Sequence, residues 1–116
     1  MSLALRKSEA FLADLDAQFR WYERQAGWDV AWRYLLEVDK ALGKLAEHPE
    51  LGWRRNFDHP ELRNLRCWLI ARPFHRHLIF YRHDQHTLDA VRVMHGARDL
   101  ARRLRQPPGV AGDQTE

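Results

Sequence analysis

The sequence has one cysteine and no long apolar run. A single cysteine cannot close an internal disulfide, so the composition gives no sign of an oxidising compartment. A membrane-spanning helix needs about 20 consecutive apolar residues, and residues 1–7 lack the apolar stretch of a secretory signal. With 45% hydrophobic and 30% charged residues, the chain is also too apolar for a disordered protein. We therefore expect a cytoplasmic protein with no membrane partner.

Positive charge is concentrated in the second half of the chain. Residues 54–105 contain 12 arginines, no lysine and 5 acidic residues, whereas residues 1–53 contain 7 basic and 9 acidic ones. Arginine forms planar, forked hydrogen bonds with carboxylate and phosphate groups. We expect this half to meet an anionic partner, either nucleic acid or an acidic protein segment; a solvated basic surface is the alternative.

Two amphipathic helices are predicted in the first half. Ser8 is a good N-cap for a helix over residues 9–26, and Gly27 suits the left-handed cap that ends it. A second helix is predicted from Asp29 to just before Pro49. The apolar positions at helical spacing are Phe11, Leu15, Phe19, Tyr22 and Ala26, followed by Ala31, Leu35, Val38, Leu42 and Leu45. The turn between the helices is short, so they must pack as an antiparallel hairpin.

Strand-forming residues dominate three runs in the second half, and one short run precedes the first helix. The runs cover residues 65–70, 75–82 and 87–95, with an N-terminal edge strand at residues 3–6. Short polar loops between the three runs indicate an antiparallel meander. The sequence therefore predicts an α+β fold, in which the hairpin packs on a small antiparallel sheet in the order β-α-α-β-β-β.

Residues 1–105 are predicted to form a single domain. Residues 49–60 are rich in turn formers and are expected to be a loop, and residues 97–104 can form a short arginine-rich helix. The polar, proline- and glycine-bearing tail, residues 106–116, is expected to be disordered.

The alternation along the strands divides their side chains between two faces. The face predicted to pack under the helical hairpin carries Leu65, Cys67, Leu69, Leu78, Phe80, Val91 and Val93. The face predicted to be exposed carries Arg66, Trp68, His77, Ile79, Tyr81, Arg92 and Met94. A face that mixes arginine and aromatic side chains is more typical of a surface covered by a partner than of one left in water. We therefore predict this second face to be a docking surface.

A phosphate-binding or ribonuclease site is a second hypothesis for the end of the last strand. Arg66, Arg92 and Arg98 could neutralise a phosphate, and His95 could act as a general acid or base near neutral pH. The structural alternative, which we favour, is that His95 ends the strand and Arg92 pairs with an acidic partner.

For three other side chains, a structural role is the default expectation. Cys67 lies between apolar strand positions and is predicted to be a buried thiol. His75 and His77 are two residues apart on a predicted strand and so share a face, but no third ligand stands at a convincing spacing. No metal or cofactor is therefore predicted, and both histidines are expected at the surface or in an interface.

The order of these features resembles the ParE branch of the ParE/RelE toxin superfamily, the plasmid-stabilisation toxins. The most specific part is residues 92–100, Arg-Val-Met-His-Gly-Ala-Arg-Asp-Leu, which is similar to the closing R-V-x-H-G-x-R-D-L pattern of the family. The run Pro49-Glu50-Leu51-Gly52 and the strand ending in Tyr81-Arg82 add to it. The resemblance covers about residues 3–104.

The resemblance implies the toxin of a type II toxin–antitoxin pair. Its partner would be a small antitoxin, of ribbon-helix-helix type, whose acidic C-terminal segment wraps the toxin. The side chains expected to bind that segment are Arg66, Trp68, His77, Tyr81, Arg92 and Arg98. ParE-like members poison DNA gyrase, whereas RelE-like members cut mRNA on the ribosome.

The residues favour the gyrase-directed branch, which is not enzymatic. RelE-like ribonucleases carry an arginine three residues before the tyrosine of the third strand, where this chain has Leu78, and a C-terminal tyrosine that is missing after Arg98. A metal-independent mRNA endonuclease using His95, Arg98, Arg92 and Arg66 stays an alternative, as do a non-toxic nucleic-acid-binding module and a degenerate toxin that binds only its antitoxin.

Overall fold

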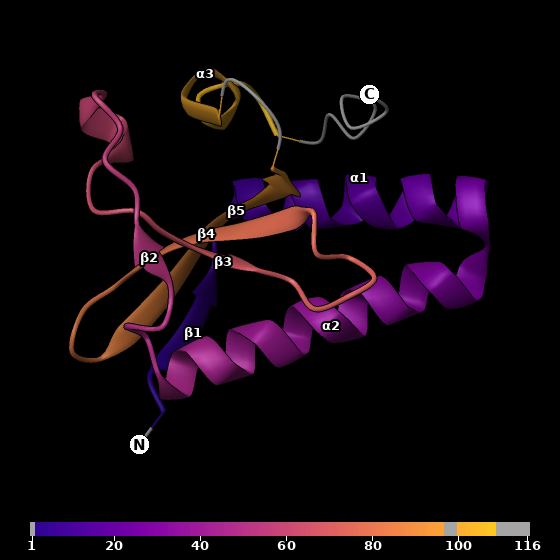
Figure 1. Ribbon diagram of the computed structural model, residues 1–116, viewed down its shortest axis with the longest axis horizontal. Helices are drawn as coiled ribbons and strands as arrows, with labels where there is room; N and C mark the ends of the chain where they lie inside the picture. The colour runs from indigo at the N-terminus through magenta and orange to yellow at the C-terminus, as the bar shows by residue number, and fades with distance from the viewer. Residues whose placement is uncertain (1, 97–99, 109–116) are drawn as a thin grey trace.

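A helical hairpin covers one face of a five-stranded sheet in the computed structural model, which describes residues 2–96 and 100–108 (Figure 1). The elements follow in the order β1 (Ala4–Lys7), α1 (Glu9–Ala26), α2 (Trp28–Glu47), β2 (Trp53–Arg54), a 3₁₀ turn (Pro60–Leu62), β3 (Arg66–Leu69), β4 (His77–His83), β5 (Thr87–His95) and α3 (Leu100–Leu104). The strand order is β1-β5-β4-β3-β2; β1 is parallel to β5 and the other pairs are antiparallel. The predicted α+β fold and element order are confirmed.

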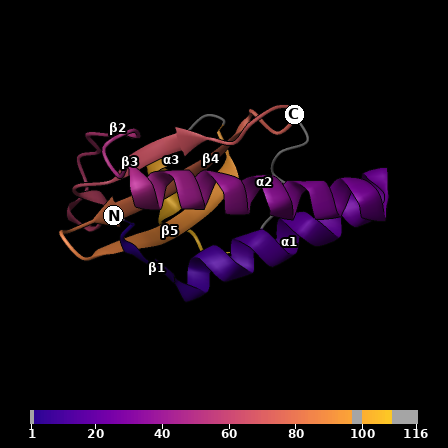
Figure 2. The same ribbon diagram turned by 90° about the horizontal axis from the view of Figure 1, so that it is seen from below.

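The two long helices begin and end where the capping residues predict. The Ser8 hydroxyl accepts from the Phe11 N–H at 2.9 Å, which caps α1. Gly27 has φ +98°, a conformation that favours glycine, and separates α1 from α2. Because only this residue joins the helices, α2 turns back along α1, and Figure 2 shows both helices from below.

The sheet has an apolar cluster on each face, and this corrects the predicted assignment of faces. The hairpin packs on Ile79, Tyr81, Leu88, Ala90 and Val93, with half-buried Trp68 at the margin. Leu65, Cys67, Leu78 and Phe80, predicted under the hairpin, lie on the opposite face with Leu62 and Leu104. Leu69, also predicted there, is 45% exposed. Alternation shows which residues share a face, but both faces here are apolar, so it could not show which face meets the helices.

A β-bulge separates two valines that alternation placed together. Phe80 pairs with Arg92 and Tyr81 pairs with Ala90, so Val91 is an extra residue in β5. Val93 consequently packs under the hairpin, whereas Val91 contacts the opposite cluster.

The loop predicted at residues 49–60 contains more structure than expected. Trp53 and Arg54 pair with β3 as a short edge strand, and the 3₁₀ turn begins at Pro60. Leu62 of this turn and Leu104 of α3 close the second cluster, so α3 lies on the sheet face opposite α2, as Figure 1 shows. Gln106 accepts a hydrogen bond from Arg92, so the described fold extends into the predicted tail, whose residues 109–116 lie outside the described ranges.

Candidate functional site

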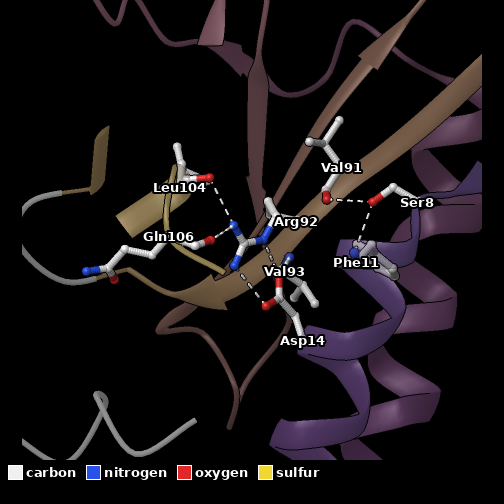
Figure 3. Close-up of polar contacts among 8 residues, drawn as sticks. All are labelled: Ser8, Phe11, Asp14, Val91, Arg92, Val93, Leu104 and Gln106. Carbon is white, nitrogen blue, oxygen red and sulfur yellow. Dashed lines mark hydrogen bonds and ion pairs between the residues drawn. The ribbon is translucent and has the colours of Figure 1, made fainter. Parts of the chain in front are cut away.

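Arg92 belongs to an internal ion pair and not to an exposed face (Figure 3). Its Nε and Nη2 donate to the two carboxylate oxygens of Asp14 at 2.6 and 3.0 Å, and its Nη1 donates to the carbonyls of Leu104 and Gln106 at 2.9 and 3.1 Å. The guanidinium therefore joins α1 to the chain that follows β5. Arg92 was predicted to bind a partner or a phosphate, but these four hydrogen bonds commit it to the fold.

The start of α1 completes the edge of β5 where β1 ends. The last β1–β5 pair is Lys7 with Ala90, and from there Ser8 donates to the Val91 carbonyl at 2.8 Å. Asp14 accepts from the Val93 N–H at 3.3 Å. Figure 3 shows both contacts beside the guanidinium. The helix thus supplies the hydrogen bonds that a neighbouring strand would supply.

Tyr81 and Arg66 hold the turn at residues 49–52. The buried Tyr81 hydroxyl donates to the Pro49 carbonyl at 2.6 Å and accepts from the Gly52 N–H at 2.9 Å. Arg66 Nη1 donates to the Gly52 carbonyl at 2.7 Å. A Cβ at Gly52 would collide with the Tyr81 hydroxyl and lie 2.9 Å from the Cys67 carbonyl. Residues that carry the family resemblance in this region therefore have a structural explanation.

His77 is buried among aromatic side chains, and this corrects the predicted surface position. It is 3% exposed, and its Nε2 lies 2.9 Å from the Tyr22 hydroxyl. The imidazole packs against the rings of Tyr22, Tyr34 and His95, and these contacts cannot replace the hydrogen bonds with water that are lost on burial. Burial and, secondarily, His95 lower the pKa of His77 to about 4. His75 is exposed because β4 begins only at His77, so the two histidines do not share a strand face.

The residues of the hypothetical ribonuclease site are not gathered at one place. Arg66 pairs with Tyr81 on the hairpin face, whereas Arg92 pairs with Phe80, whose side chain lies on the other face. His95 ends β5 opposite His77, and Arg98 lies outside the described residues. Within the described ranges no group of three or more potential metal ligands occurs. Cys67 is buried as predicted, and burial raises the pKa of its thiol to about 11.

The protein itself covers most of the predicted docking face. Trp68 of this face is half-buried. Its ring lies under the Lys44 ammonium, 5.5 Å from the ring centroid, and packs against the hairpin-side cluster. Of the seven residues predicted on the exposed face, Ile79, Tyr81, His77 and Arg92 are buried.

The outward side of the hairpin carries an exposed apolar stripe that alternation along the strands could not reveal. Trp28, Trp32 and Leu36 recur every four residues on α2 and are 59%, 42% and 56% exposed. Phe19 of α1 packs edge-on against Trp32 at 5.7 Å, and Leu12 lies two turns before it. We call these five residues the hairpin stripe. The sequence signal for it was the pair Trp28 and Trp32, four residues apart at the start of the second predicted helix.

The described helices include none long and apolar enough to cross a membrane.

Comparison with known proteins gives one family and one fold. The model of the ParE toxin of the type II toxin–antitoxin system parDE matches residues 5–100. A solved structure titled as a chromosomal ParDE system from P. aeruginosa is similar, with a TM-score of 0.67 and 18% identity over 83% of this chain and 98% of that chain. No match is found among curated proteins.

Proposed function

Since the family match spans residues 5–100, this chain belongs to the ParE toxins of type II toxin–antitoxin systems, and we propose that a small antitoxin holds it inactive and that the free toxin inhibits DNA gyrase. Both the antitoxin and gyrase would act in the cytoplasm, where we place the chain.

The hairpin stripe supports a partner on the helices and not on the sheet. Large apolar side chains that recur at helical spacing and stay exposed are typical of a protein interface. Trp28 and Trp32 contact each other at 5.5 Å, so the tip of the stripe is a preformed aromatic surface. A segment with one apolar face would bury this surface, and a small antitoxin can order such a segment on binding. The hairpin covers one sheet face and α3 lies on the other, which supports the stripe as the proposed docking surface.

Surface arginines would guide an acidic antitoxin segment to the toxin. Arg54, Arg72 and Arg105 are exposed, and residues 54–105 hold most of the positive charge. Such charges raise the rate of encounter with an acidic chain, and apolar anchors then slow dissociation.

The arginine contacts favour gyrase inhibition over mRNA cleavage. Arg92 donates to Asp14 and to two backbone carbonyls, and Arg66 donates to the carbonyls of Glu50 and Gly52. A nuclease needs such cations at the reacting phosphate, where the loss of one electrostatic contact costs about 2.7–4 kcal/mol of barrier.

The antitoxin proposal is tested with the small protein encoded beside this gene. Leu36→Glu and Trp32→Glu should weaken the complex by at least about 100-fold, because each places a charge in a buried apolar contact. Leu69→Glu is the matched control, since Leu69 is a similarly exposed leucine on β3. Equal loss of affinity in Leu69→Glu, or full affinity in both stripe variants, would exclude the stripe as the docking surface.

The gyrase proposal is tested separately with purified toxin in a supercoiling assay. Inhibition that the antitoxin reverses is expected. Intact supercoiling at saturating toxin, together with cleaved transcripts in arrested cells that disappear in His95→Ala, would establish the ribonuclease alternative instead.

A further inference from the structure

A pocket of about 240 Å³ lies between α1, the connection from β3 to β4, and the end of β5. Its lining includes Trp21, Tyr22, His75, Arg76, His77 and His95. Figure 1 shows the β3–β4 connection extending beyond the sheet toward the hairpin, and Phe74 of this connection contacts Tyr34 of α2. The pocket is smaller than a site for a drug-sized molecule, so it suits a small ligand or one group of a larger one.

The lining favours an anion. Arg76 carries a permanent positive charge and is exposed at the pocket, and the described lining residues include no carboxylate. Three imidazoles add further donors. A divalent cation would meet Arg76, and the described residues hold no group of three or more potential metal ligands.

His77 offers a buried polar atom that no described residue satisfies. Its Nε2 is engaged with Tyr22, while its Nδ1 is buried and has no hydrogen-bond partner in the described part of the chain. When the Tyr22 hydroxyl donates to Nε2, the neutral ring carries its proton on Nδ1 and becomes a donor there. An unpaired buried donor is costly, so an acceptor atom that reached it from this pocket would be stabilising. The atom has almost no exposed surface, so the side chains around it would have to shift slightly to admit a ligand oxygen.

We propose that this pocket binds a phosphate monoester, with Arg76 as the charge partner and His77 as a buried donor to a phosphoryl oxygen. Arg76 and His75 stand at the mouth, and His77 lies deepest. The ligand can be inorganic phosphate or the phosphate of a nucleotide. Trp21 and Tyr22, whose rings meet at 5.3 Å, provide a wall on which a nucleobase could stack.

The site is distinct from the proposed antitoxin surface. None of its lining residues belongs to the hairpin stripe. The two proposals can therefore fail independently.

The test is a titration of the full chain at constant ionic strength with three probes: inorganic phosphate, adenosine monophosphate and acetate. Calorimetry gives the affinity, and ¹H–¹⁵N spectra of the imidazoles report which histidines respond. Saturable phosphate binding is expected, with shifts of the His77 and His95 ring nitrogens and no saturable response to acetate. Tighter binding of adenosine monophosphate would identify a nucleotide as the source of the phosphate, and equal binding would identify phosphate alone.

Variants distinguish the pocket from the general positive surface. Arg76→Ala and His77→Gln should each weaken phosphate binding about tenfold or more, the value of a hydrogen bond to a charged group. Arg33→Ala and His86→Gln, which change exposed residues outside the lining, should leave it unchanged. Arg76 is exposed, so its variant tests the site even where His77→Gln lowers stability. No saturable binding, equal binding of acetate, or an unchanged affinity in Arg76→Ala would overturn the proposal.

Discussion

Arg92 and Asp14 are 78 residues apart in the sequence, yet their buried side chains meet in a two-point ion pair at 2.6 and 3.0 Å. The pair stands where β1 ends and α1 takes over the edge of β5. Arg92 also reaches the backbone carbonyls of Leu104 and Gln106. Arg92 is the first residue of the pattern that carries the family resemblance. Its hydrogen bonds therefore connect β5 with α1 and with the segment at Leu104 and Gln106.

Removal of Arg92 alone should destabilise the fold more than removal of Arg92 and Asp14 together. Arg92→Met leaves a carboxylate buried beside β5 and should lower the free energy of unfolding by about 3–5 kcal/mol. Adding Asp14→Leu removes that charge, so the double variant should be more stable than Arg92→Met alone. Urea denaturation measures all three proteins. Arg20→Ala is the control, because its pair with Asp16 is exposed and should contribute less than about 1 kcal/mol. A double variant less stable than Arg92→Met would contradict the assignment.

Sequence patterns predicted the elements well because each rests on local chemistry. Ser8 and Gly27 mark the helix ends through capping and φ, and these effects act within a few residues. The alternation in β3 and β4 likewise indicated strands. What alternation could not supply was the side of the sheet on which α1 and α2 pack, because apolar side chains stand on both faces.

The functional residues were harder to predict because their roles depend on distant partners. The bulge at Val91 reverses which side chains of β5 point to each sheet face, and no residue type in the sequence predicts a bulge there. One signal was available: Asp14 and Gln18 fall on the same helical face as Phe11, where a solvated residue would be out of place. A buried aspartate needs a cation, and the arginine-rich second half was the place to seek it.

Gly52→Ala and Gly43→Ala should change stability in opposite directions. At Gly52 a methyl group would meet Tyr81 and the Cys67 carbonyl, so the substitution should cost about 1–3 kcal/mol through overpacking. At Gly43, inside α2, nothing lies within 4 Å of the new methyl group. Gly43→Ala should therefore stabilise the protein by about 0.5–1 kcal/mol, the helix preference of alanine over glycine. Thermal unfolding compares the two, and a neutral Gly52→Ala would show that the turn at residues 49–52 is not held as described.

Substitutions at Ser8 can separate its two hydrogen bonds. The hydroxyl accepts from Phe11 N–H and donates to the Val91 carbonyl. Ser8→Ala loses both, whereas Ser8→Asp keeps an acceptor for the helix cap and loses the donor. We expect Ser8→Ala to lower the free energy of unfolding by about 1–2 kcal/mol, with Ser8→Asp between it and the unchanged chain. If aspartate and alanine prove equally destabilising, the cap contributes nothing and the contact with the bulge explains the whole effect.

His77 should make the fold sensitive to acid. Burial, with a smaller contribution from His95, lowers its pKa from 6.5 to about 4 in the folded state. The ring packs against Tyr22, Tyr34 and His95, so none of these contacts in the described part of the chain brings a carboxylate that would offset the cost of a charge. The unfolded chain takes up the proton first as the pH falls below about 6.5. The stability that neutral His77 provides is therefore complete above that pH and is lost as the pH falls toward 4.

The loss between about pH 7.5 and pH 4 should reach roughly 3 kcal/mol relative to a variant without the imidazole. His77→Phe is that variant, because phenylalanine fits the aromatic surroundings and does not titrate. Urea denaturation of both proteins across this range gives the difference, which cancels the contribution of the carboxylates. His86→Gln, an exposed histidine at the far end of β4 and β5, should follow the unchanged chain. Parallel pH profiles for the unchanged chain and His77→Phe would show that the buried ring is solvated more than its contacts indicate.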